Sequence, residues 1–204
     1  LKDLSVKTVY KNNSNHPINQ IIGNEKDKNI YFTSSKFKFL NSKNVVTKEK
    51  SIAVKDIKKI DETYYSFAAS GLCGLFKVSD KKSIWDNIHQ KNLNTSNNFN
   101  ESILLKSNGK STTYNPFNKS IYFATNVGLK CVNTNAITEI TFENKPLFIT
   151  NLQSYKDLVF GLSTNEELYK IDSKNKVTQI SIFKKHLKER FTKFKIQENS
   201  IFIF

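Results

Sequence analysis

One short apolar pattern recurs along the sequence, and it limits the chain to a small group of folds. A strand-like segment rich in aromatic and β-branched residues occurs at residues 29–33, 64–68, 120–124, 157–161 and 200–203. Each copy follows a polar turn, and another short apolar run precedes that turn. A unit of this kind cannot bury its apolar face alone, so we expect successive copies to pack against one another.

The spacing of the copies predicts four-stranded blades. Phe32, Phe67, Phe123 and Phe160 hold the same place in successive copies, at separations of 35, 56 and 37 residues. A propeller blade takes about 40 residues in the best-known repeat families. The wide separation therefore predicts one blade plus an insertion, which we place at residues 91–110. That segment is rich in Asn and Ser and holds a single apolar island.

The predicted fold is an all-β β-propeller. Four full blades and partial terminal blades lie at the low end of the roughly 4–8 blades that close a propeller. We therefore expect a fragment of a larger propeller, cut from a longer precursor; the alternative is a small closed ring completed by residues 4–10. In the second blade the fourth strand is expected at residues 83–89. The full blades are predicted at residues 17–50, 51–90, 111–143 and 145–183, and the partial blades at residues 1–16 and 189–204.

Residues 121–129, IYFATNVGL, resemble the two-component regulator propeller repeat, in which an aromatic strand is followed by Thr-Asn-x-Gly-Leu and a further strand. Residues 69–72, ASGL, carry a second version, and residues 163–171 carry a weaker one with Glu167 at the glycine position. The resemblance implies the extracytoplasmic sensor domain of a Bacteroidetes hybrid histidine kinase, in the periplasm or outside the cell. It further implies a homodimer whose arrangement changes on ligand binding, with any kinase activity outside this chain.

The residues give no indication of catalysis, a metal or a cofactor. His16, His89 and His186 have no second ligand at metal spacing. No G-x-S-x-G elbow, phosphate-binding glycine loop or H-E-x-x-H motif occurs. Cys73 and Cys131 both fall in third-strand regions, where burial as small hydrophobes is the favoured interpretation and a disulfide between blades is the alternative.

The formal charge of +14 raises the question of nucleic-acid binding, which we consider unlikely. Only Arg190 is arginine among the 32 basic residues, whereas recognition of bases and phosphates favours arginine. The lysines are spread over the turns, and only residues 183–195 combine dense positive charge with aromatic residues. No apolar run approaches the roughly 18–20 residues that a membrane-spanning helix needs.

A binding role is therefore expected. In a propeller the turns between the second and third strands gather on one face, and binding sites commonly form on loops held by a rigid scaffold. Their Ser, Thr and Asn side chains suit a polar small molecule or oligosaccharide, although tight turns need the same residues. The only tryptophan could stack on a sugar ring, but packing between blades is the favoured interpretation. The candidate ligand-binding residues are Ser70, Trp85, Thr125, Asn126, Thr164 and Asn165.

Two functions remain open at this point. The first is the sensor module that the resemblance implies. The second is a secreted or surface-attached propeller for adhesion or protein assembly, with residues 91–110 and 183–195 as contact elements and a protein as the partner. A membrane span downstream in the full gene product would favour the sensor, and a secretion-sorting domain would favour adhesion.

Overall fold

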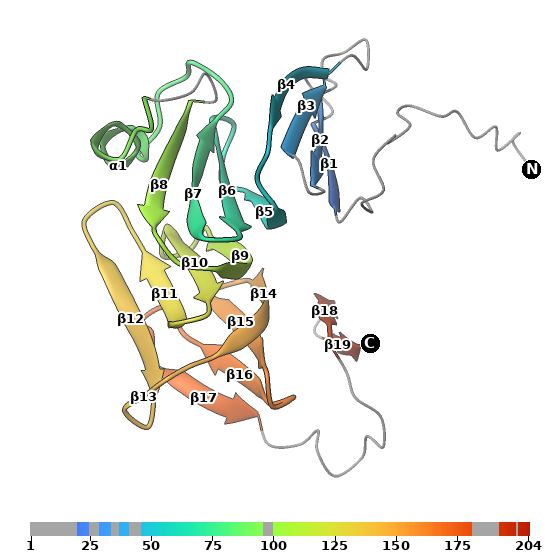
Figure 1. The fold of residues 1–204 in the computed structure, drawn as a ribbon. Helices are drawn as coiled ribbons and strands as arrows, with labels where there is room; N and C mark the ends of the chain where they lie inside the picture. Colours follow the sequence, from blue (N-terminus) through green and yellow to red (C-terminus); the bar gives the residue numbers. More distant parts are fainter. Residues whose placement is uncertain are drawn as a thin grey trace, which may run out of the picture. The chain divides into compact units, whose positions relative to one another are not determined.

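The computed structural model describes residues 20–24, 29–33, 37–40, 46–95, 100–180, 192–198 and 200–204 (Figure 1). The chain divides into two compact units, Leu1–Val54 and Lys55–Phe204, and each is considered by itself. The partial blade expected at residues 1–16 lies outside the described residues, as does most of the basic segment 183–195.

The first unit contains one four-stranded antiparallel sheet, the first sheet. Its strands follow the order of the chain, and Ile21 pairs with Phe32 between the first two. The strand expected at residues 29–33 is therefore confirmed. The strands are β1 (Gln20–Asn24), β2 (Asn29–Thr33), β3 (Phe37–Leu40) and β4 (Val46–Lys50).

The remaining strands form three further sheets and a hairpin, again in chain order. The second sheet comprises β5 (Val54–Lys59), β6 (Tyr64–Ala69), β7 (Leu72–Lys77) and β8 (Glu101–Leu105). The third comprises β9 (Gly109–Asn115), β10 (Ser120–Thr125), β11 (Gly128–Val132), β12 (Ile137–Phe142) and β13 (Lys145–Pro146). The fourth comprises β14 (Ile149–Tyr155), β15 (Leu158–Ser163), β16 (Leu168–Ile171) and β17 (Val177–Ile180). The terminal hairpin comprises β18 (Phe194–Gln197) and β19 (Ser200–Ile203).

The fourth strand of the second sheet differs from the sequence-based expectation. Residues 83–89 form a turn and the start of helix α1 (Asp86–Lys91), so the strand predicted there is wrong. Ser83 explains the difference: its backbone N–H donates to Asp86 Oδ2 (2.9 Å), and its Oγ accepts from the N–H of Trp85 (3.3 Å). Such local side-chain bonds compete with strand pairing. The apolar island of the expected insertion supplies the fourth strand instead, as β8.

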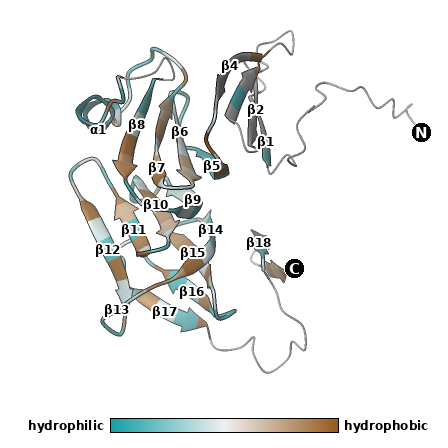
Figure 2. Ribbon diagram, viewed as in Figure 1, coloured by the Kyte–Doolittle hydropathy of each residue, from teal (hydrophilic) through white to brown (hydrophobic). Residues whose placement is uncertain are grey.

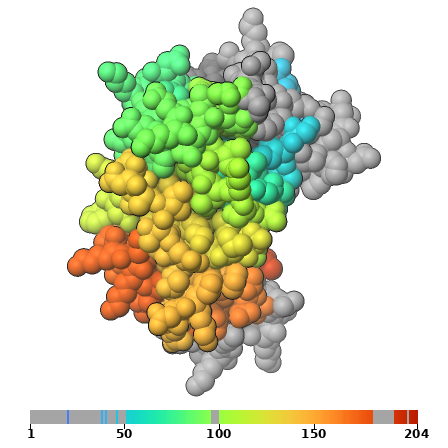
Figure 3. Space-filling view, turned by 60° about the vertical axis from the view of Figure 1, so that its left-hand side comes forward, coloured from blue at the N-terminus to red at the C-terminus, as the bar shows by residue number. Residues whose placement is uncertain are grey.

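Apolar side chains fill the spaces between neighbouring sheets of the second unit. All six residues of β10 are buried, so this strand has no solvent-facing side. One cluster joins the second and third sheets and includes Trp85 and Phe123. Figure 2 shows hydrophobic residues along β11 and β15 and mostly hydrophilic residues on helix α1. Figure 3 shows the second, third and fourth sheets as one continuous packed surface, coloured from green through yellow to orange.

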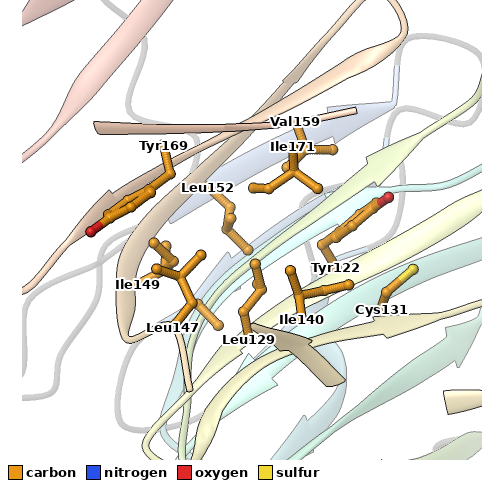
Figure 4. Packing of buried hydrophobic residues seen from close by; sticks show 11 residues of the cluster. Tyr122, Leu129, Cys131, Ile140, Leu147, Ile149, Leu152, Val159, Tyr169 and Ile171 are labelled. Atoms are coloured by element: carbon orange, nitrogen blue, oxygen red, sulfur yellow. The ribbon is translucent and has the colours of Figure 1, made fainter. Parts of the chain in front are cut away.

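A second cluster joins the third and fourth sheets (Figure 4). Leu129, Ile140, Leu147 and Leu152 approach one another at its centre. Tyr169 lies at the edge of this cluster with its hydroxyl pointing away from the other side chains. The core thus extends from one sheet to the next, which is the packing expected of stacked repeats.

Polar side chains connect the first strands of successive sheets. Asp56 on β5 accepts hydrogen bonds at Oδ2 from Ser111 Oγ (2.7 Å) and the N–H of Thr112 (2.9 Å), both on β9. Ser111 Oγ also accepts from the N–H of Leu152 on β14 (3.1 Å). One buried serine therefore contacts the first strands of both neighbouring sheets.

The same type of connection continues to the terminal hairpin. Thr113 Oγ1 accepts from the N–H of Ser154 on β14 (3.0 Å). The side chain of Gln153 makes two bonds to the backbone of Ile196 on β18, donating from Nε2 (3.1 Å) and accepting at Oε1 (2.9 Å). The first strands therefore lie side by side, with side chain to backbone bonds between them, as in the inner strands of propeller blades.

Candidate ligand-binding site

Two of the candidate turns are held together by Asn108. Its Oδ1 accepts from the N–H of Gly71 (2.7 Å), next to Ser70 in the turn between β6 and β7. Its backbone exchanges two bonds with Asn126: Asn126 N–H to the carbonyl of Asn108 (2.9 Å), and Asn108 N–H to Asn126 Oδ1 (3.0 Å). Ser70 and Asn126 are exposed, but the amide oxygen of Asn126 already serves the backbone. The structure thus brings these turns together through a structural contact.

Thr125 and Trp85 are both completely buried. Thr125 Oγ1 donates to the carbonyl of Gly128 (2.7 Å) and accepts from the N–H of Val127 (3.2 Å), so it shapes the turn from inside. Trp85 lies against Tyr114 of the third sheet, with ring centroids 6.2 Å apart. Neither side chain is accessible to a ligand in this arrangement, and the tryptophan packs between two sheets.

Thr164 and Asn165 differ from the other candidates because they line a cavity of about 380 Å³. The cavity lies between the third and fourth sheets, and both side chains are exposed in the turn that joins β15 to β16. Ser163 anchors that turn, because its Oγ accepts from the N–H groups of Asn165 (3.2 Å) and Glu167 (3.1 Å). A cavity of this size is in the range of ordinary small-molecule sites.

An aromatic corner forms part of the cavity wall. The rings of Phe142 and Tyr169 meet edge to face, with centroids 5.2 Å apart and planes at 65°. The Tyr169 hydroxyl donates to Glu167 Oε2 (2.8 Å), which fixes both side chains. Burial, together with the hydrogen bond to Glu167, raises the pKa of Tyr169 to about 12, so the phenol stays protonated at neutral pH.

The rest of the wall combines apolar and polar groups. Pro146 and Leu147 add apolar surface, and Phe148 is 43% exposed. Gln179 of β17 adds an exposed amide, and Lys145 adds a cation. Sequence reasoning did not find these residues, because the cavity wall combines segments that are far apart in the chain: residues 142–148, residues 163–169 and Gln179. The turn signature at residues 163–171 was the only local signal.

The two cysteines and the possible metal ligands of the described residues can also be compared with the sequence-based expectations. Among the described residues, no group of three or more His, Cys, Asp and Glu side chains is placed to hold a metal ion. Cys73 and Cys131 are buried free thiols, which agrees with the favoured interpretation. Burial raises the pKa of Cys73 to about 12 and also raises that of Cys131, so both remain protonated thiols. In the described part of the chain, no helix is both long and apolar enough to span a membrane.

No family model matches the sequence, and no curated protein matches it either. Solved β-propeller structures do match the fold. Virginiamycin B lyase from Staphylococcus aureus, in a catalytically inactive form with quinupristin, has 15% identity and a TM-score of 0.60 over 84% of this chain and 58% of its own. The Swd1 β-propeller domain from Myceliophteria thermophila has 12% identity and a TM-score of 0.63, and the match covers 93% of this chain and 62% of that domain. A protein of unknown function from Bacteroides caccae has 8% identity and a TM-score of 0.58, and the match covers 95% of this chain and 72% of that protein.

These similarities establish the fold class predicted from the repeat: the chain is all-β and forms a β-propeller structure. It spans about three fifths of the length of the first two structures named. At such low identity the likeness extends to the fold alone, and the first of these neighbours is an enzyme.

Proposed function

We propose that this chain is a non-enzymatic ligand-binding β-propeller whose site is the cavity at the turn between β15 and β16. The observation that carries the proposal is the convergence of Thr164 and Asn165 with the aromatic corner of Phe142 and Tyr169 around one cavity of about 380 Å³. The ligand is a polar small molecule, of which an oligosaccharide is the best fit. Sugar hydroxyls can both donate to and accept from the hydroxyl and amide groups of the wall, and the apolar face of a sugar ring suits an aromatic surface.

The biological setting that we propose is an extracytoplasmic sensor module of a two-component signalling receptor. The support is the repeat signature at residues 121–129 together with a ligand-sized cavity between two sheets. A ligand that contacts the third and fourth sheets at once would favour one spacing between them. That change would then be transmitted to a dimer partner and to an output domain elsewhere in the full protein.

The binding proposal is tested with soluble oligosaccharides on a glycan array, followed by calorimetry on the best ligand. Asn165→Ala and Gln179→Ala each remove an exposed amide from the cavity wall and should weaken binding by about tenfold, since each loses a hydrogen bond to the ligand. Asn135→Ala is the matched control, because Asn135 is an exposed asparagine in a turn that does not line the cavity. Equal loss in the control, or an array with no retained sugar, would refute the glycan site.

The sensor setting needs a separate experiment. The native protein is isolated and its intact mass and peptide map are determined beyond residue 204. A longer chain with a membrane span and a kinase supports the sensor. A secretion-sorting domain without a kinase would instead support the adhesion or assembly alternative, with a protein as the partner.

A further inference from the structure

A second concave site lies along the first strands of the second, third and fourth sheets. It is a groove of about 370 Å³, and β5, β9, β14 and β18 all contribute to it. It shares no lining residue with the cavity between the third and fourth sheets. Its chemistry is also different, because its lining includes two lysines and no acidic residue.

Several side chains that line the groove can donate hydrogen bonds. Lys58 and Lys59 supply ammonium groups, Tyr114 supplies a phenol, and Asn151 supplies an amide. Burial raises the pKa of Tyr114, and the negative charge of Asp61 raises it further, so its hydroxyl keeps its proton at neutral pH. The rings of Trp85 and Tyr114 meet edge to face, with planes at 78°. A buried core side chain therefore holds one of the donors in place.

Lys58 is not required to satisfy the acid that it contacts. Its Nζ lies 3.2 Å from Asp56 Oδ1, and its side chain is 39% exposed. Neutral groups already donate to both oxygens of that carboxylate, including the N–H of Ile57 to Oδ1 (2.9 Å) and Ser111 Oγ to Oδ2. The ammonium can therefore turn toward a ligand while the carboxylate keeps these bonds.

Lys59 is also available at small energetic cost. Its Nζ lies 3.2 Å from Glu62 Oε1, with the two side chains 44% and 46% exposed. Exposed ion pairs of this type contribute little to stability, because water screens them. Two adjacent lysines on β5 can thus reorganise around an anion without loss of the inner-strand connections.

We propose that this groove binds the oxyanion group, a carboxylate or a phosphate, of a small ligand. The lysines supply charge, and Tyr114 and Asn151 supply further donors on the neighbouring first strands. Charge-assisted hydrogen bonds of this kind are shorter and stronger than neutral ones. The ligand would contact three sheets at once.

The test is a titration of the full chain with inorganic phosphate and, separately, with succinate at constant ionic strength, followed by calorimetry and by backbone amide NMR. The double variant Lys58→Gln/Lys59→Gln should weaken binding by about tenfold or more. Lys174→Gln/Lys176→Gln removes the same charge from exposed lysines between β16 and β17 and should change the affinity by less than about twofold. Binding of phosphate, of succinate or of both supports the proposal and identifies the oxyanion that the groove accepts, whereas binding of neither anion overturns it.

A third variant separates binding from folding. Tyr114→Phe retains the ring contact with Trp85 and removes one donor, so it should weaken binding severalfold while the urea unfolding midpoint stays close to that of the parent. Asn165→Ala changes the cavity between the third and fourth sheets and should leave phosphate binding unchanged. Loss of glycan binding and loss of phosphate binding can therefore be told apart. Equal weakening by both lysine pairs, or amide shifts that avoid β5, β9 and β14, would overturn the proposal.

Discussion

The carboxylate of Asp56 accepts a 2.9 Å hydrogen bond from the backbone N–H of Thr112, and this bond joins the first strands of the second and third sheets. Ser111 Oγ donates to the same oxygen at 2.7 Å. Asp56→Ala would leave both buried donors without this acceptor, so we expect the free energy of unfolding to fall by about 2–4 kcal/mol. Asp56→Asn keeps one acceptor oxygen and should lose about half as much.

Urea unfolding of the full chain measures these losses. Asp157→Ala is the matched control, because Asp157 is an exposed aspartate in the turn between β14 and β15, and its loss should stay within about 0.5 kcal/mol. A loss in Asp56→Ala no larger than that of the control would show that the connection between the first strands contributes little to stability.

Trp85 provides a second prediction, because it is the only tryptophan and is fully buried. Its fluorescence should be emitted at short wavelength and resist quenching by iodide, and no sugar should alter it by direct contact. Trp85→Ala should lower the free energy of unfolding by about 3–5 kcal/mol through the cavity that it creates. Strong iodide quenching in the native state would show that the side chain is accessible after all.

The repeat and its turn chemistry predicted much of this fold, because both are local properties. The aromatic and β-branched run at residues 120–124 and the glycine at 128 are visible in the local sequence, and β10 and β11 form there. The strand expected at residues 83–89 was wrong because the bonds of Ser83 and Asp86 depend on side-chain geometry. Of the six candidate site residues, Thr164 and Asn165 line the cavity. Phe142 and Gln179 also line it but were not candidates, because only the packing of the third sheet against the fourth brings them there.

The buried side chain of His89 should make the free energy of unfolding fall in mild acid. Its side chain is buried beside Tyr64, near Asp86 and Lys77, and Nε2 lies 3.3 Å from Asn100 Oδ1. Burial lowers its pKa below the ordinary 6.5, so below pH 6.5 the unfolded chain binds a proton that the folded chain does not. The free energy of unfolding should therefore decrease as the pH falls below 6.5, by at most about 1.4 kcal/mol per pH unit. Above pH 6.5 the ionisation of His89 should have no effect on stability.

The measurement for His89 is urea unfolding of the parent and of His89→Gln across this pH range. The parent should lose more stability than the variant as the pH falls, and the NMR signal that disappears in the variant should titrate below pH 6.5. A His89 signal that titrates above pH 6.5 would reverse the expected sign.

Gly128 is a position where an added methyl group is expected to lower stability. Its φ is +115°, and an added Cβ would lie 3.2 Å from Glu139 Oε1 and 3.4 Å from Pro146 Cβ. Gly128→Ala should therefore cost about 1–3 kcal/mol of stability through strain. Gly71→Ala is a useful comparison, because its φ is +85° with no atom within 4 Å of the added Cβ, and it should cost less. Equal thermal shifts would mean that the close contacts at Gly128 are relieved without penalty.

Tyr169 connects the cavity to a measurable titration. Because its side chain is buried and its hydroxyl also donates to Glu167 in the wall, its pKa of about 12 lies above the ordinary value of 10.0. The unfolded chain therefore loses this proton first, and the contribution of Tyr169 to stability should decline as the pH rises from 10.0 to about 12. A titration followed by tyrosinate absorbance should show one group fewer near pH 12 in Tyr169→Phe than in the parent.

Tyr155→Phe is the control, because Tyr155 is a half-buried tyrosine outside the cavity wall. If the group lost in Tyr169→Phe titrates near 10.0 instead, the phenol is not held by Glu167, and the wall of the proposed glycan site is not preorganised in the way the structure indicates.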